Sequence, residues 1–446
     1  MNQRLRIFFF GRVLLLAAVM ATFPAWAGTY YVSVRGDDGN PGSLAQPWQT
    51  VNYALTRLRP GDTLYLRGGT YYEQVEVGVS GTASQPITIA GYAGEQTVID
   101  SGFPEFQAPG NSDWELVNGG RGEYRSKRSC QDKNIYTYVT GIAGYENERV
   151  ALIPYQDIGH FRANTDSYAG SGSDFYVGPG TMEIAGRCHI RLAKTTAMRN
   201  AEVRYGKVFA SENANPGAYG IVMSQAINTL RVSGAYLTFK DITFNQAKRT
   251  ILLDPGAHHV RFEGITAWMG ASTVQTYSSQ VHHITITDSR ILGDAPYWVF
   301  WSDMKNAPQV ANLSRGTSIN LQGGTHDWNI SHSLIRGSGQ DLIGTNNGEH
   351  RIFVHHNRIE NCGDDAFEIE GKAEHGGRDD IGHIQIYENY IANCLVAVAV
   401  GQDTRKMTGP LLFYRNIVAM LRDHPVNRKA GINHWNGGGQ FGYGKM

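Results

Sequence analysis

The sequence lacks an excess of charge of either sign, because 40 Lys and Arg residues balance 40 Asp and Glu residues. A neutral chain offers no broad basic surface, and we therefore expect no nucleic-acid partner. Long helical patterns are also scarce among the 446 residues, whereas 53 glycines punctuate the chain. This composition is typical of a turn-rich all-β protein.

Long apolar runs are missing after the first residues, and no later stretch approaches the ~20 residues of a membrane-spanning helix. Residues 1–27 have the form of a signal peptide. Arginines precede the apolar run from Val13 to Val19, and Ala25-Trp26-Ala27 fits the small-x-small cleavage rule. We predict cleavage after Ala27 and a secreted or periplasmic protein with no membrane span.

Cysteine is rare, with four residues in the chain. An exported protein can oxidise its cysteines, and we predict a disulfide between Cys130 and Cys188. Cys362 and Cys394 occupy the same phase of two successive repeats. Their spacing is compatible with a disulfide or with a stack of buried thiols.

A short pattern recurs from Leu230 onward, with a period of about 24 residues. Each copy alternates apolar residues like a strand and then places a small residue or Asn before another apolar residue. The copies begin at Leu237, Val260, Ile284, Trp328, Ile352, Ile384 and Leu411. This period predicts a parallel β-helix, in which each coil buries its inner residues against the next. A leucine-rich horseshoe has a similar period, but its LxxLxL signature and helix are absent.

The repeat also suggests how the chain is divided. Residues 28–102 are interpreted as an N-terminal cap and the first coils, with a short helix around Val51, Ala54, Leu55 and Leu58. Residues 103–228 break the rhythm and are interpreted as an inserted β-rich subdomain, or alternatively as irregular coils of the same stack. Residues 229–446 supply the remaining coils.

Two consequences follow for the coils. Asn357, Asn389 and Asn416 are expected to form a hydrogen-bonded ladder inside a turn, since buried amides need partners. After Val418 no capping segment is evident, and one expectation is a truncated copy whose last coils lie beyond Met446.

Alignment of the coils places outward polar residues in one stripe across neighbouring strands. The stripe contains Gln275, Tyr277, Asn320, Gln322, Gly344, Asn346, Glu368 and Glu370. Its shape suits an extended polymer, although a polar face is also ordinary for an exposed sheet. Residues 294–316 add aromatic and basic side chains that suit either sugar stacking or packing over the coils. The predicted substrate contacts are Trp298, Trp301, Asn320, Gln322, Tyr277 and Arg315.

Acidic residues gather on two neighbouring coils. Hard oxygen ligands of this kind suit Ca²⁺, although Asp residues can also cap turns. The predicted calcium ligands are Asp341, Asn346, Asp364, Asp365, Glu368 and Glu370.

The opening (TYYVS, GDDGNPG, PGDTLYLRGGTYYE and SGTASQPITIAGY) and the coils from Leu230 resemble the secreted right-handed parallel β-helix polysaccharide-active proteins. Asp341 with Asp364-Asp365-x-x-Glu368 is similar to the calcium-binding acids of the pectate lyases that use a Lys base. Asn346 with Glu368-x-Glu370 and Lys372 resembles the chondroitinase B and alginate lyase family. The strand LVAVAVGQD from Leu395 has no Lys where the pectate lyase pattern has its base.

The resemblance implies an all-β fold, a right-handed parallel β-helix (solenoid), with a β-elimination activity on a uronic-acid polymer. In that reaction Ca²⁺ binds the sugar carboxylate and a base removes the C5 proton. Lys372 is the first candidate for the base, with Arg378, His375, Lys305 and Lys406 in reserve.

We therefore expect a monomeric, calcium-assisted polysaccharide lyase whose partner is an acidic polysaccharide. Two alternatives stay open. One is a glycoside hydrolase or C5-epimerase on the same scaffold, and the other is a non-catalytic glycan-binding surface protein.

Overall fold

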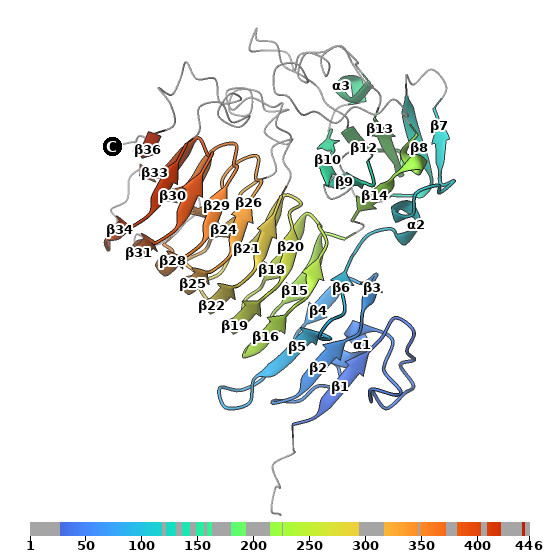
Figure 1. Ribbon diagram of the computed structural model, residues 1–446, viewed down its shortest axis with the longest axis horizontal. Coiled ribbons are helices and arrows are strands. Elements are labelled where there is room, and N and C mark those ends of the chain that lie inside the picture. Colours follow the sequence, from blue (N-terminus) through green and yellow to red (C-terminus); the bar gives the residue numbers. More distant parts are fainter. Residues whose placement is uncertain are drawn as a thin grey trace, which may run out of the picture.

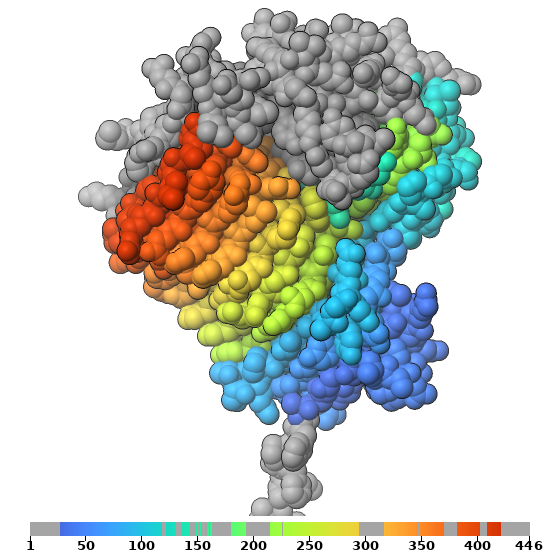
Figure 2. Space-filling view, in the orientation of Figure 1, coloured from blue at the N-terminus to red at the C-terminus, as the bar shows by residue number. Residues whose placement is uncertain are grey.

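The computed structural model describes residues 27–117, 122–130, 136–142, 149–155, 158–162, 180–192, 215–224, 226–293, 316–346, 348–371, 381–402, 408–420 and 439–441. The predicted signal peptide lies outside these ranges except for Ala27. Three long parallel sheets run along a stack of coils, and the chain visits them in turn (Figure 1). In Figure 2 the coils form a continuous stack from the blue N-terminal end to the red C-terminal end.

The first sheet contains the strand that opens each coil. Its strands are β1 (Thr29–Val32), β2 (Thr63–Leu66), β5 (Ile87–Gly91), β16 (Leu237–Lys240), β19 (His258–Glu263), β22 (His282–Thr287), β25 (His326–Ser331), β28 (His350–His355), β31 (Gly382–Tyr387) and β34 (Leu411–Tyr414).

The second sheet contains short strands that follow a sharp corner. Its strands are β3 (Gly69–Tyr71), β6 (Thr97–Ile99), β17 (Thr243–Phe244), β20 (Thr266–Trp268), β23 (Arg290–Leu292), β26 (Leu334–Arg336), β29 (Arg358–Glu360), β32 (Tyr390–Ala392) and β35 (Ile417–Ala419).

The third sheet closes each coil and includes the polar stripe predicted from the sequence. Its strands are β4 (Val75–Val77), β15 (Asn228–Val232), β18 (Arg249–Leu253), β21 (Ser272–Thr276), β24 (Ile319–Leu321), β27 (Ile343–Thr345), β30 (Asp365–Gly371), β33 (Val396–Gln402) and β36 (Gly439–Phe441).

The register of the first sheet confirms the predicted repeat. Leu237 opposes Val260, Val260 opposes Ile284, and the same phase continues through Trp328 to the last coil at Leu411. These inward side chains are buried up to Ile384, because each coil covers the apolar face of its neighbour. The right-handed parallel β-helix is therefore the fold of this chain.

The corner between the first and second sheets is made by one residue in the left-handed backbone region. Asp241, Asp288, His356 and Glu388 adopt it with φ of 54°, 52°, 57° and 55°. Gly264 takes the same position with φ of 65°, where an added Cβ would collide with the Asp241 carboxylate. A single left-handed residue bends the chain sharply from the first sheet into the second. The residue that follows it again points its side chain into the stack.

A ladder of side-chain oxygens follows this corner inside the stack. Each oxygen accepts the backbone N–H of the preceding coil. The series runs from Ser289 and Ser333 to Asn357, Asn389 and Asn416, with donor–acceptor distances of 3.2, 3.1, 2.9, 3.0 and 2.9 Å. The predicted asparagine ladder is confirmed, and two serines extend it.

The N-terminal cap contains the predicted short helix, α1 (Val51–Leu55). Its N-terminus is capped by Thr50, whose side chain accepts the Tyr53 N–H, and by the Glu73 carboxylate, which accepts the Val51 N–H at 2.8 Å. Val51, Ala54, Leu55 and Leu58 are all buried in the main core. The predicted short helix and the burial of its apolar face are therefore confirmed.

Between β6 and β15 the chain leaves the stack and forms two small sheets (Figure 1). The elements there are α2 (Pro104–Gln107), β7 (Trp114–Leu116), β8 (Glu123–Ser129), β9 (Thr137–Thr140), β10 (Val150–Ala151), β11 (Ile153–Pro154), α3 (Ile158–Arg162), β12 (Gly180–Ile184), β13 (Arg187–Arg191), η1 (Pro216–Ala218) and β14 (Gly220–Met223). They enclose a separate cluster of buried apolar side chains from Phe103 to Met223. We propose that this segment is an inserted subdomain.

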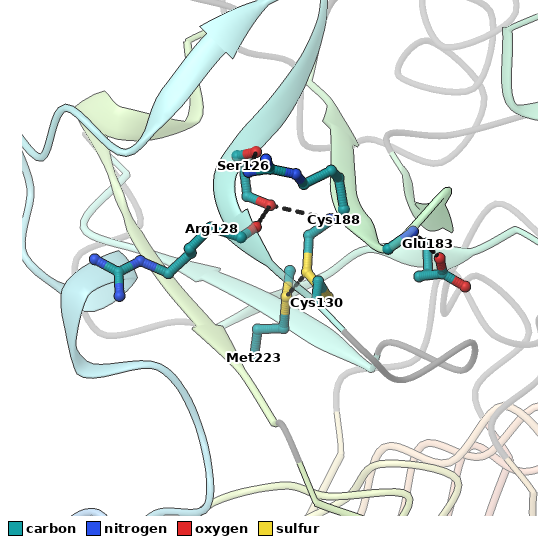
Figure 3. Close-up of a disulfide and its surroundings, with 8 residues drawn as sticks. Ser126, Arg128, Cys130, Glu183, Cys188 and Met223 are labelled. Atoms are coloured by element: carbon teal, nitrogen blue, oxygen red, sulfur yellow. Dashed lines mark hydrogen bonds between the residues drawn. A yellow bond between two sulfur atoms is a disulfide. The ribbon is translucent and has the colours of Figure 1, made fainter.

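The disulfide between Cys130 and Cys188 lies inside this cluster, as predicted, with Met223 beside it (Figure 3). The backbone N–H of Cys188 donates to the Ser126 hydroxyl at 3.0 Å, and that hydroxyl donates to the Arg128 carbonyl at 2.7 Å. The bridge therefore links the end of β8 to β13.

A test of the ladder is the substitution Asn389→Ala. It removes the acceptor of the Asn357 N–H and the donor to the Val354 carbonyl, so buried groups lose partners. We expect a loss of about 3 kcal/mol in the free energy of unfolding, measured by chemical denaturation. Asn416→Ala, at the partly exposed end of the ladder, should cost less. Equal and negligible losses for both variants would contradict a stabilising ladder.

A second test concerns Glu123, whose carboxylate is buried. Burial raises the pKa of this carboxyl, but hydrogen bonds from His189 and Arg162 outweigh burial and lower the pKa to about 2. Because the pKa is lower in the folded protein, the carboxylate stabilises the fold fully at pH values above ~4.3, the pKa of Glu in the unfolded chain. This stabilisation is lost as the pH falls toward 2. Glu123→Gln should therefore cost about 2 kcal/mol near neutral pH and progressively less below pH ~4. Thermal unfolding of both proteins across this pH range measures the difference, and a constant difference would contradict the assignment.

Candidate active site and cation site

The outward stripe of the third sheet follows the predicted alignment. Gln275 opposes Asn320, Asn320 opposes Gly344, and Gly344 opposes Glu368. Phe367 and Ile369 are buried on either side of Glu368 in β30, so the Glu368 carboxylate points outward. The stripe thus crosses four neighbouring coils.

Three aspartates meet where the chain enters the third sheet. One carboxylate oxygen from each of Asp341, Asp364 and Asp365 lies within 4.8 Å of the others. All three side chains are buried, with exposed fractions of 3%, 3% and 7%. Asp341 and Asp365 come from equivalent positions of successive coils, as predicted, and the Asp365 N–H donates to Asp341 Oδ1 at 3.2 Å.

The electrostatics of this corner are unfavourable for three bare carboxylates. Burial raises the pKa of Asp341 well above its ordinary value, and the nearby charges of Glu368, Asp364 and Asp365 raise it further. The Thr317 hydroxyl, which donates to Asp341 Oδ2 at 3.2 Å, offsets only part of this repulsion. Such a group of acids requires a shared proton or a bound cation.

A disulfide fixes the backbone beside the aspartates. Cys362 and Cys394, on consecutive coils, are bonded, which resolves the alternatives of disulfide and thiol stack in favour of the disulfide. The Leu395 N–H also donates to the Asp364 carbonyl at 2.7 Å. The corner that presents Asp364 is therefore tied to the following coil.

The donor set fits Ca²⁺, because carboxylate oxygens at ~2.4 Å from a common ion lie no more than ~4.8 Å apart. Glu368 adds a fourth carboxylate that contacts Asp341. Asn346 is placed differently, since it follows β27 whereas Asp341 precedes this strand, about 16 Å away along an extended chain. Asn346 is thus separated from the predicted aspartate ligands.

The other predicted residues have mixed outcomes. Tyr277 is 50% exposed just beyond β21, with the Arg249 guanidinium 5.4 Å from its ring centre. Gln322 is half-buried just beyond β24, and Asn320 lies in the stripe. Lys372, His375, Arg378, Lys305, Lys406, Trp298, Trp301, Arg315 and the side chain of Glu370 lie outside the described part of the structure.

A polar cluster between the insertion and the coils could not be predicted from the sequence. The Arg149 guanidinium lies 4.1 Å from the Trp268 ring centre and donates to Asn245 Oδ1 at 2.9 Å. Asn245 in turn donates to the Asp100 carboxylate at 2.6 Å. Residues up to 145 positions apart in sequence meet here, at the same corner of earlier coils as the aspartates. Arg149 is a candidate partner for a substrate carboxylate.

Comparison with known proteins agrees with this scaffold. Residues 30–122 match the family described as Pel9A-like, right handed beta helix region. A pectate lyase of Emericella nidulans is 39% identical over 105 residues, which are 23% of this chain and 25% of the lyase. An uncharacterized protein of Bacillus subtilis is 40% identical over 74 residues, 16% of each chain. The resemblance to β-helix polysaccharide-active proteins is confirmed, and the scaffold is polysaccharide lyase-like. The matches cover a quarter or less of these relatives.

Solved structures were also compared. XylC in complex with xylose aligns with a TM-score of 0.46 and 15% identity over 88% of this chain and 63% of its own. A glycoside hydrolase aligns with a TM-score of 0.48 and 13% identity over 91% and 99% of the two chains. Pectate lyase Pel9A aligns with a TM-score of 0.45 and 12% identity over 88% and 77%.

Within the described residues, no helix has the length and apolar character needed to cross a membrane.

The cation site can be tested by thermal unfolding with and without Ca²⁺. At a concentration 100 times Kd, Ca²⁺ should stabilise the native protein by about 2.7 kcal/mol. Asp341→Asn should abolish this response. Because it removes one of the repelling charges, the same substitution should raise stability in a chelator by on the order of 1 kcal/mol.

The control is Glu263→Gln, which removes an acid that pairs with Arg261 and Lys240 on the first sheet. This variant should keep the calcium response. A calcium response that persists in Asp341→Asn would place the ion elsewhere.

Proposed function

We propose that this protein is a secreted polysaccharide lyase that cleaves a uronic-acid-containing polymer by calcium-assisted β-elimination. The observation that carries the proposal is the buried group of Asp341, Asp364 and Asp365 with Glu368, at the end of a polar stripe on a β-helix. The 39% identity over 105 residues to a protein named as a pectate lyase supports the same class of chemistry.

In this proposal the acidic corner holds Ca²⁺ against the substrate. The ion would neutralise the uronate carboxylate and stabilise the negative charge that develops when the C5 proton leaves. The protein's own part is to fix the ligand geometry. The register between Asp341 and Asp365, the hydrogen bond from Thr317 and the disulfide at Cys362 hold the carboxylates in place before substrate binds.

The sugar chain is proposed to lie along the third sheet. Adjacent coils are spaced ~4.8 Å apart, similar to the length of one sugar residue, so successive strands can each contact one unit. Asn320 and Tyr277 present an amide and an aromatic ring along this path, whereas Gln275 at the same phase is buried. Arg149 extends the path toward the insertion and supplies a positive charge for a second carboxylate.

Lys372 remains the proposed base. In the sequence it directly follows Gly371, the last residue of β30, the strand that carries Glu368. Arg378, His375 and Lys305 stay as reserves.

One observation favours a second candidate, a glycoside hydrolase. Burial and the neighbouring acids raise the pKa of Asp341, which is the property of a general acid, while a second carboxylate from Glu368 lies beside it. Hydrolysis produces reducing ends without a new double bond. The products of a lyase carry both a new reducing end and a new double bond.

Export is proposed from the signal-like segment that ends at Ala27. The two disulfides support an oxidising compartment, since structural disulfides are rare in the reducing cytosol. We propose that the mature protein acts as a monomer on an acidic polysaccharide.

The activity is tested by the ultraviolet absorbance of the conjugated double bond that β-elimination creates. Purified mature protein is incubated with pectate, alginate, chondroitin sulfate, dermatan sulfate and hyaluronan, with Ca²⁺ or with a chelator. We expect calcium-dependent absorbance on one class of polymer and a loss of at least about a hundredfold in kcat/KM for Glu368→Gln. Glu263→Gln is the matched control on another face. New reducing ends without the absorbance would assign hydrolysis. The absence of both the absorbance and new reducing ends would contradict an enzyme that acts on these polymers.

A further inference from the structure

A second cluster of candidate ligands lies at a different corner of the stack, where the chain enters the first sheet. His258 and His259 open β19, and His282 and His283 open β22 on the next coil. One nitrogen from each of His259, His282 and His283 lies within 4.8 Å of the others. These residues have no part in the proposed chemistry, which belongs to the third sheet.

The backbone explains why neighbouring histidines converge. Adjacent residues of a strand normally point to opposite faces. His259 and His283 instead adopt the left-handed region, with φ of 54° and 56°, which turns each toward its predecessor. As a result, His282 Nδ1 lies 2.7 Å from His283 Nδ1 and His258 Nδ1 lies 3.0 Å from His259 Nδ1.

The repeat then joins the two pairs. The rings of His259 and His283 stack with centres 4.4 Å apart and planes 11° apart, and those of His258 and His282 stack at 5.0 Å. His259 and His283 are exposed to solvent, whereas His282 is half-buried. The repeat therefore gathers three imidazole nitrogens from two coils within 4.8 Å, and binding of one ion requires the exposed rings of His259 and His283 to rotate out of their stack, since a metal binds in the plane of each ring.

The carboxylate of Asp327 lies next to the histidine cluster. Asp327 Oδ2 is 3.7 Å from His283 Nδ1, and Arg351 holds the Asp327 carboxylate with two hydrogen bonds of 2.6 and 2.7 Å. Asp327 Oδ2 is also paired with His326 Nδ1 at 2.7 Å, so this carboxylate places a negative charge near His283 without a hydrogen bond to it.

We propose that His259, His282 and His283 bind a divalent first-row transition-metal ion, such as Zn²⁺, that cross-links two successive coils. Imidazole nitrogen suits Zn²⁺, Cu²⁺ and Ni²⁺, whereas Ca²⁺ requires oxygen ligands. Three protein ligands leave one position for water in a tetrahedral site. This site is separate from the acidic corner in both ligand type and sheet.

The experiment is calorimetric titration of ZnCl₂ into tag-free mature protein at neutral pH, with excess Ca²⁺ present to occupy oxygen-ligand sites. We expect one Zn²⁺ per chain and a higher unfolding temperature in its presence. His283→Asn and His282→Gln should each weaken binding by at least about tenfold, since even the loss of a supporting residue costs that much. Asn is chosen at position 283 because it tolerates the left-handed backbone.

The matched control is His383→Asn. His383 is exposed and has the same left-handed conformation, with φ of 54°, on a later coil. This variant should bind Zn²⁺ like the native protein, and circular dichroism verifies the fold of all three variants. Absence of binding by the native protein, binding unchanged in both ligand variants, or an equal loss in His383→Asn would each overturn the proposal.

Discussion

The structure depends on the parallel pairing of successive coils at a fixed phase. Each coil has no other partner for its inner face, so one apolar side chain must rest on the equivalent side chain of the next coil, as Val260 rests on Ile284. This constraint also stacks every outward residue on its counterpart. A site that needs several like groups close together can therefore be built by repeating one residue type at one phase. The histidine pairs of β19 and β22 arise in this way, as does the pairing of Asp341 with Asp365.

The histidine cluster and the aspartate cluster differ in the electrostatic repulsion that stacking produces. Stacked imidazoles are neutral in one protonation state and pack as rings, so the histidines at the first sheet tolerate close approach. Stacked carboxylates repel, and burial of Asp341, Asp364 and Asp365 makes this repulsion large. A natural fold keeps such a group when a ligand compensates for it. The acidic corner is thus the strongest candidate for a functional site in the described part of the chain, and the disulfide beside it ties the corner to the following coil.

Much of this arrangement could be predicted from the sequence because it follows from period and phase. The inward positions, the asparagine ladder and the juxtaposition of Asp341 with Asp365 require only that coils stack in register. The choice between disulfide and thiols at Cys362 and Cys394 could not be predicted, since it depends on side-chain directions at a corner. The contact of Arg149 with Trp268 was also hidden, because it joins an insertion without periodicity to a coil. The convergence of His282 and His283 depends on a left-handed residue, which an alternating strand pattern conceals.

The most direct test of the central claim is a crystal structure of the mature protein with Ca²⁺ and a uronate oligosaccharide, with the ion located by anomalous scattering. The account predicts one calcium bound by Asp341, Asp364, Asp365 and Glu368, with a sugar carboxylate completing its coordination. Aspartates that remain hydrogen-bonded to one another without an ion, while the oligosaccharide binds on another face, would contradict it.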